Sequence, residues 1–153
     1  MSEPVAELDR QFSSPDATPT PWAAARSQLD AAKTYWLSTV RPDGRPHVTT
    51  IAGVWTDDAV HFVTGPSERK ALNMAAGNHH VVVTTGCNGW EGLDVVVEGE
   101  AVRVTDPDRL ARLDPGKTSG VVKRAALFTK LGGHCPARIL GEVAVARDTN
   151  PDN

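Results

Sequence analysis

The chain has 153 residues, a length that suits one domain with a sizeable hydrophobic core. Hydrophobic residues make up 40% of it, which argues against disorder of the whole chain. Sixteen Lys and Arg against nineteen Asp and Glu leave a formal net charge of −3. That balance does not indicate a sheath of basic charge for nucleic acid or for an anionic membrane.

No targeting or membrane-spanning segment is expected. The N-terminus, MSEPVAELDRQF, is acidic and lacks the apolar run of a signal peptide, and the longest apolar run in the chain is too short for a membrane span. The two cysteines, Cys87 and Cys135, lie far apart and form no CxxC motif. This usage favours a reducing compartment, so we expect a cytoplasmic protein.

The first third of the chain predicts an arm, a helix and a β-hairpin. Residues 1–20 are polar and rich in proline, which is typical of a flexible N-terminal arm. Thr20 and Pro21 suit the N-cap and first position of a helix with the sequence WAAARSQLDAAK. The strand TYWLSTV (34–40) follows, RPDG is a turn signal, and RPHVTTIAGVW (45–55) returns as the second strand.

The middle of the chain predicts further strands around one helix. After the TDD turn, AVHFVT (59–64) forms a third strand, a helix occupies 67–77, and HHVVVTTG (79–86) forms a fourth strand. The segment LDVVVEGEAVRV (93–104) predicts a long fifth strand. Its apolar residues change parity around Gly99, where we expect a bulge or a barrel corner.

The remaining elements complete the predicted fold. Asp106 and Pro107 start a short helix, and ARILGEVAVAR reads as a last strand. Successive antiparallel strands, one intervening helix and a glycine kink predict a small, mainly β barrel with peripheral helices. We divide the chain into the arm (1–20), a barrel domain (21–113) and a C-terminal segment (114–153) that completes the same domain.

The stretch SERKALNMAAGN places two cations where a helix does not favour them. With Ser67 as N-cap, Arg69 and Lys70 fall in the first turn, where a cation costs about 0.3–1 kcal/mol against the helix dipole. A phosphate there, also reached by Thr64, would make both cations charge-assisted partners. Glu68 offsets part of this positive field when no ligand is bound. The alternative is a solvated helix face with Glu68 beside its neighbours.

The run from VTGPSERK through the helix to NHHVVV resembles the FMN-binding split-barrel family, which includes pyridoxamine 5′-phosphate oxidase and relatives that use the deazaflavin coenzyme F-420. In that family a Thr precedes Ser-Arg-Lys, and Asn-Pro precedes the next strand; here Glu68 is inserted and His79 replaces the Pro. The resemblance covers about residues 30–113. It implies an antiparallel split β-barrel and an oxidoreductase that transfers hydride to or from an unknown small molecule.

The resemblance also implies which residues contact the cofactor. Arg69 and Lys70 would bind the phosphate, and the strand VTTI would run along the ring. Deazaflavin-using relatives often have Pro at the position of Thr50, so FMN is favoured and F-420 is the alternative. Asp94 stands where the oxidases carry a cofactor-contacting Gln. The implied positions are Val48, Thr49, Thr50, Ile51, Val63, Thr64, Arg69, Lys70 and Asp94.

The family usually forms dimers with each cofactor held between the subunits, so the resemblance implies a homodimer. We name no catalytic residue, because hydride chemistry belongs to the cofactor. A non-catalytic flavin carrier or sensor is the second hypothesis. A nucleic-acid-binding barrel is the third, and the net charge of −3 argues against it.

Several other residues have structural interpretations. His79 and His80 are adjacent on a strand and point to opposite faces, so no metal site is expected there. His47 and His61 are expected to pair structurally across neighbouring strands. The tryptophans that could stack on a ring are expected in the core instead. These are Trp36, Trp55 and Trp90.

The resemblance stops after Asp114. Relatives continue with a Trp-rich helix and a Pro-Thr-Lys-like strand, whereas this chain has one aromatic residue, Phe128, in its last forty positions. Sequence divergence and a frameshift in the coding sequence both explain the difference, and translating the other two frames would separate them. The missing motifs, which help to close the site in relatives, add weight to the carrier or sensor hypothesis.

Overall fold

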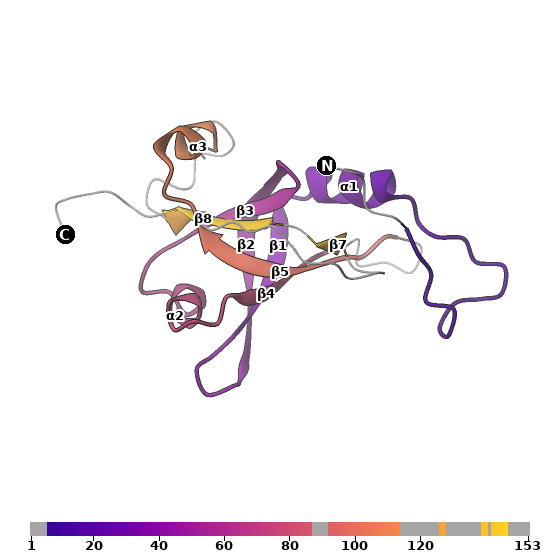
Figure 1. Ribbon diagram of the computed structural model, residues 1–153, viewed down its shortest axis with the longest axis horizontal. Helices are drawn as coiled ribbons and strands as arrows, with labels where there is room; N and C mark the ends of the chain where they lie inside the picture. Colours follow the sequence, from indigo (N-terminus) through magenta and orange to yellow (C-terminus); the bar gives the residue numbers. More distant parts are fainter. Residues whose placement is uncertain (1–5, 87–91, 114–125, 128–138, 141, 147–153) are drawn as a thin grey trace.

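The computed structural model describes residues 6–86, 92–113, 126–127, 139–140 and 142–146, which form a β-barrel with peripheral helices (Figure 1). The helices are α1 (Trp22–Ala31), α2 (Arg69–Ala75) and α3 (Pro107–Arg112). The strands are β1 (Thr34–Val40), β2 (Pro46–Thr56), β3 (Ala59–Thr64), β4 (His80–Thr85), β5 (Val95–Arg103), β6 (Ala126–Leu127), β7 (Ile139–Leu140) and β8 (Glu142–Ala146). Within these ranges no helix is long and apolar enough to cross a bilayer.

The strand pairings close into a ring. The sheet order is β4-β1-β2-β3-β6-β8-β5-β7, and the additional pairings of β4 with β5 and of β3 with β8 complete the circle β4–β1–β2–β3–β8–β5. Most pairs are antiparallel, as predicted for a split barrel. The exceptions are β8, which runs parallel to both β3 and β5, and β7, which runs parallel to β5. The predicted last strand thus lies between β3 and β5.

Two long strands, β2 and β5, pass from one half of the barrel to the other. β2 pairs with β1 through Ala52 and with β3 from Gly53 onwards. β5 pairs with β4 through Glu100 and with β8 from Ala101 onwards. A Cβ added to Gly53 would lie 3.0 Å from Tyr35 Cδ2, so the missing side chain lets the Tyr35 ring pack against β2 where this strand changes partner.

Of the two alternatives predicted at Gly99, a bulge or a barrel corner, the structure has the corner and no bulge. The β4–β5 register runs without a break past Gly99, which pairs with Val81. Val97 and Ala101 are both buried, while Val102 is 45% exposed. The small Ala101 therefore continues the inward face and Val102 points outward. Val104 is buried as predicted, but it lies beyond the end of β5 and packs in a separate small cluster with Val63. The strand turns the barrel corner by changing its partner, with no extra residue.

Turn and cap signals in the sequence explain where most elements end. Gly44 has a φ of +85° and closes the hairpin between β1 and β2. Asp57 and Asp58 both have positive φ, as a two-residue turn between β2 and β3 requires. Asp106 caps α3 by accepting a backbone N–H at 2.7 Å, as predicted.

The predicted N-caps of the other two helices are wrong. Pro21 has extended backbone (φ −60°, ψ 142°) and takes the cap position of α1 in place of Thr20. In α2 the cap position belongs to Glu68 and not to Ser67, because a turn closed by a 3.1 Å bond from Glu68 N to Gly65 O precedes the helix. Neither cap residue makes a side-chain cap hydrogen bond.

Apolar side chains fill the barrel and attach α1 to it. Trp55 is buried and packs edge-to-face on Trp22, with ring centroids 6.2 Å apart. Trp36 is 46% exposed on the outside of the barrel, so its predicted place in the core is wrong; Trp90 lies outside the described residues. Fully buried apolar side chains include Leu29, Tyr35, Leu37, Val60, Phe62, Met74, Val83 and Val97.

His61 is buried and does not pair with His47. The register places His61 opposite Val54 and His47 opposite Thr39, because β2 changes its partner between these two positions. His61 Nε2 lies 3.0 Å from the Thr56 carbonyl, which can only accept, so Nε2 carries the proton of a neutral ring. Burial, the largest cause, lowers the pKa of His61 to about 4.

We predict that neutral His61 makes the fold sensitive to acid. With an unfolded pKa of about 6.5 and a folded pKa of about 4, only the unfolded chain binds the proton between these pH values. The contribution of neutral His61 to the free energy of unfolding is therefore complete above pH 6.5 and is lost as the pH falls to 4. The loss amounts to about 3 kcal/mol. Urea unfolding of wild type and His61→Gln should show stability curves that converge on acidification. A separation that stays constant between pH 7 and pH 4 would contradict the prediction.

Candidate functional site

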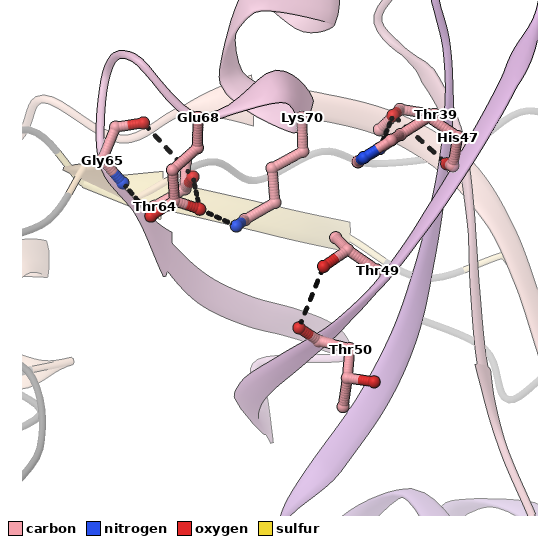
Figure 2. Close-up of polar contacts among 8 residues, drawn as sticks. All are labelled: Thr39, His47, Thr49, Thr50, Thr64, Gly65, Glu68 and Lys70. Carbon is pink, nitrogen blue, oxygen red and sulfur yellow. Dashed lines mark hydrogen bonds and ion pairs between the residues drawn. The ribbon is translucent and has the colours of Figure 1, made fainter.

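The turn between β3 and α2 brings three hydrogen-bond donors onto one carboxylate (Figure 2). Thr64 ends β3, Gly65 begins the turn, and Lys70 is the second residue of α2. Thr64 Oγ1 donates to Glu68 Oε2 at 2.9 Å, and Gly65 N–H donates to Glu68 Oε1 at 3.0 Å. The Lys70 ammonium also donates to Glu68 Oε2. The donors therefore enclose a position suited to an anionic oxygen group.

Lys70 is a buried cation. Its side chain is 11% exposed, whereas that of Glu68 is 47% exposed. Burial lowers the pKa of Lys70, because the charged form loses solvation. A buried ammonium is costly unless an anion pairs with it, and Glu68 is that anion here. The solvated-face alternative therefore fails for Lys70, while Arg69 is exposed as that alternative expects.

Strand β2 presents an open backbone edge near this ion pair. The segment 46–52 pairs with β1, and β3 pairs with β2 only from Gly53. Among the strands that the structure describes, none pairs with the other edge of 46–52. Within the described ranges the N–H and C=O groups along that edge have no strand partner, and the Thr50 carbonyl accepts a 3.4 Å contact from Thr49 Oγ1. Figure 2 shows the Thr49 side chain on the Lys70 side of β2 and the Thr50 side chain on the other side.

The remaining β2 positions divide between the two faces of the sheet. Ile51 is buried in the core, so only its backbone can meet a ligand. Val48 and Thr50 are exposed on the outer face. The side chain of Val63, from β3, packs with Val104 in a small apolar cluster. Because successive strand residues face opposite ways, Val63 points away from the side to which Thr64 points.

Asp94 lies at the far end of the sheet from α2. Thr85 pairs with Val95, so Asp94 lies just beyond the end of β4, whereas α2 leads into β4 at His80. β4, from His80 to Thr85, is roughly 16 Å long, so Asp94 and the end of α2 are at least about that far apart along the sheet. A Cβ added to Gly86 would lie 1.9 Å from Asp94 Oδ1, so the carboxylate packs directly on the Gly86 backbone. Asp94 and α2 therefore lie beyond opposite ends of β4.

A polar network that joins α2 to β1 and β2 was not predicted from the sequence. Asn73 Nδ2 donates to Thr39 Oγ1 at 2.9 Å, and Thr39 Oγ1 lies 3.4 Å from His47 Nδ1. Burial, followed by the charges of Arg41 and the two α2 cations, lowers the pKa of His47. The available signal was the spacing of Lys70 and Asn73, which are three residues apart and share the buried face of α2.

The described ranges hold no group of three or more His, Cys, Asp or Glu side chains that could bind a metal ion. His79 and His80 are both exposed, and His80 Nε2 lies 3.9 Å from Glu100 Oε1. At the β3–α2 turn the described donors surround a carboxylate, that of Glu68.

Known proteins share this architecture. The family model described as pyridoxamine 5′-phosphate oxidase matches residues 21–130. No curated protein matches the chain. Rv2991 of Mycobacterium tuberculosis, described as a conserved hypothetical protein, is 25% identical with a TM-score of 0.56. That alignment covers 61% of this chain and 59% of Rv2991, so the chain spans less than two thirds of this relative.

Two further solved structures show the same fold at lower identity. HutZ, the heme storage protein from Vibrio cholerae, is 17% identical with a TM-score of 0.60, covering 81% of this chain and 94% of that one. An FAD-binding protein from Mycobacterium smegmatis is 19% identical with a TM-score of 0.56, covering 86% and 91% respectively. At such identities the likeness extends to the fold alone.

We predict that the unliganded protein depends on Glu68 to neutralise Lys70. Glu68→Gln leaves a buried ammonium without its anion and should cost about 1–3 kcal/mol, less than for a fully buried pair because Glu68 is half exposed. Arg69→Gln removes an exposed charge and should cost less than about 0.5 kcal/mol. Denaturant unfolding in phosphate-free buffer measures both, and equal stabilities of the two variants would contradict the prediction.

Proposed function

The chain belongs to the pyridoxamine 5′-phosphate oxidase family, and on that premise we propose that it is an FMN-dependent oxidoreductase acting on a small molecule by hydride transfer. The observation that carries the proposal is the convergence of Thr64, Gly65 and Lys70 on one anionic group beside the open edge of β2. A flavin mononucleotide needs both features, an anion site for its phosphate and a polar strand edge for its ring.

The residues at the turn suit a phosphate. A hydroxyl, a backbone N–H and a buried ammonium are the donors that phosphate oxygens accept, and exposed Arg69 supplies a second cation next to Lys70. The backbone of 48–51 would meet the polar edge of the ring. Thr50 stands where deazaflavin-using relatives often carry Pro, which favours FMN over coenzyme F-420.

Bound FMN would supply the two-electron hydride chemistry, while the protein binds and orients it. The residues of this chain that serve the proposal hold the phosphate, through Lys70 and Thr64, and the ring, through the β2 backbone. We assign no catalytic residue.

A flavin carrier or sensor is the second candidate. It is favoured by the Glu68–Lys70 pair, in which Glu68 neutralises the buried cation without a ligand. The unliganded fold is then stable enough to bind a cofactor and release it again. Coupled reduction of a test acceptor with NADPH or reduced F-420 separates the two candidates. An oxidoreductase turns over, whereas a carrier binds the flavin without turnover.

We also propose that a second copy of the chain covers the outer face of the sheet. Trp36, Val48 and Val96 are 46%, 56% and 49% exposed. Trp36 pairs with Thr50 and with Thr84, Thr84 pairs with Val96, and Val48 lies two residues before Thr50, so these side chains share one face across β2, β1, β4 and β5. An apolar face of this kind is typical of an interface, and the site residues Val48 and Thr50 would then lie between subunits.

We predict that the phosphate distinguishes FMN from riboflavin in this protein. Wild type should bind FMN more tightly than riboflavin. Lys70→Met should weaken FMN binding by about tenfold or more, since a charge-assisted bond contributes about 1.5–3 kcal/mol, and should leave riboflavin binding unchanged. Flavin fluorescence titration of the apoprotein measures these constants.

Three results would count against the proposal. Equal affinities of wild type for FMN and riboflavin would show that the phosphate contributes nothing to binding. Unchanged FMN binding by Lys70→Met would place the anion site elsewhere. Clearly tighter binding of coenzyme F-420 than of FMN would overturn the choice of cofactor.

For the subunit interface we expect a dimer at micromolar concentration with FMN present. An obligate interface buries more than about 2,000 Å² in total, and a charge at its centre is strongly unfavourable. Trp36→Glu should therefore sediment as a monomer, while Phe12→Glu, which alters an 81% exposed residue of the N-terminal arm, should remain dimeric. A monomeric wild type under these conditions would refute the proposed interface.

A further inference from the structure

The carboxylate of Glu68 occupies the centre of the donor cluster. Its two oxygens accept from Thr64 Oγ1 at 2.9 Å, from Gly65 N–H at 3.0 Å and from the Lys70 ammonium. Figure 2 shows the Glu68 and Lys70 side chains extending from the start of α2 and converging near Thr64. An anion supplied by the chain itself therefore fills the position at which the proposed function places a phosphate.

We propose that Glu68 is an intramolecular stand-in for the ligand's phosphate, and that the protein takes up a phosphate-bearing ligand only in exchange for this carboxylate. Glu68 is then the residue that sets both the affinity and the charge selectivity of the site. The inference rests on the proposed function for the identity of the incoming anion.

The number of available protons requires an exchange. The Thr64 hydroxyl and the Gly65 amide each have one hydrogen to donate. The amide donates to Glu68 at 3.0 Å, and the hydroxyl makes its shorter contact, 2.9 Å, to Glu68 and a longer one, 3.4 Å, to the Gly65 carbonyl. A phosphate oxygen can accept them only after the carboxylate has released them. Lys70 has three hydrogens, but two anions held at one buried ammonium would repel each other.

The exposure of the two side chains indicates that Glu68, and not Lys70, moves in the exchange. Lys70 is 11% exposed and lies on the buried face of α2, so the cation stays in place. Glu68 is 47% exposed and makes no side-chain cap bond to the helix that it precedes. Its side chain can therefore swing into solvent without breaking a helix cap. A fixed cation and a movable anion are the parts that an exchange requires.

The exchange favours a particular class of ligand. A phosphate monoester, which carries more charge than a carboxylate and has three free oxygens, is well suited to replace Glu68. A ligand without an anionic group gains nothing from the cluster. A phosphate-bearing ligand binds only the form in which the Glu68 contacts are broken. The free energy needed to break these contacts therefore weakens the binding of every such ligand.

Removing the charge of Glu68 should therefore raise phosphate-dependent affinity. We expect Glu68→Gln to bind FMN about tenfold more tightly than wild type and to bind riboflavin equally well. The matched control is Glu7→Gln, the same change on the N-terminal arm, which lies on the α1 side of the barrel, away from α2 (Figure 1). FMN binding by Glu68→Gln that is equal to or weaker than that of wild type would overturn the exchange.

Inorganic phosphate separates this inference from the proposed function. If neither protein binds any flavin but phosphate raises the melting temperature of Glu68→Gln more than that of wild type, the exchange stands and the flavin assignment fails. If phosphate stabilises both proteins equally, the exchange is overturned.

The wild-type protein provides a test that does not depend on a variant. Saturating FMN should shift the amide resonance of Gly65, whose hydrogen-bond acceptor changes from carboxylate to phosphate, and riboflavin should leave it in place. A Gly65 amide that is unmoved by bound FMN would contradict the exchange.

Discussion

The buried ammonium of Lys70 is the constraint on which the site depends. The Lys70 side chain is only 11% exposed, so its charge needs an anion beside it. Glu68, two residues earlier in the chain, is that anion. That requirement fixes the conformation of the turn after β3, because Thr64 and Gly65 donate to the same carboxylate. It is also the basis of the selectivity that we propose, since only an anion can replace Glu68 as the partner of Lys70.

The barrel brings this turn next to a strand with a free edge. Because β2 leaves β1 at Ala52 and joins β3 at Gly53, its first half is paired on one side only among the described strands. Closure of the ring through β8 then fixes β3, and with it the turn, relative to β2. The split in the barrel is thus the feature that leaves the backbone edge of β2 and the turn that carries the buried cation open to the same proposed ligand.

Much of this architecture could be predicted from the sequence, and the failures have physical causes. Alternating apolar residues and turn chemistry located β1 and β3 to the residue, because those signals are local. The caps at Thr20 and Ser67 were wrong because Pro21 and the Gly65–Glu68 turn decide where the helices begin. The sequence predicted that Glu68 offsets part of the positive field of the two cations. It did not predict the direct pair with a buried Lys70, because burial depends on packing between distant segments. The Asn73–Thr39 bond joins residues 34 positions apart and was invisible for the same reason.

The most direct test of the account is a crystal structure of the protein with FMN bound. We predict that the FMN phosphate contacts Thr64 Oγ1, Gly65 N–H and the Lys70 ammonium. The ring should lie along the 46–52 edge of β2, and the Glu68 side chain should be turned into solvent. A complex in which FMN is bound while the Glu68–Lys70 pair stays intact and the phosphate lies elsewhere would contradict it.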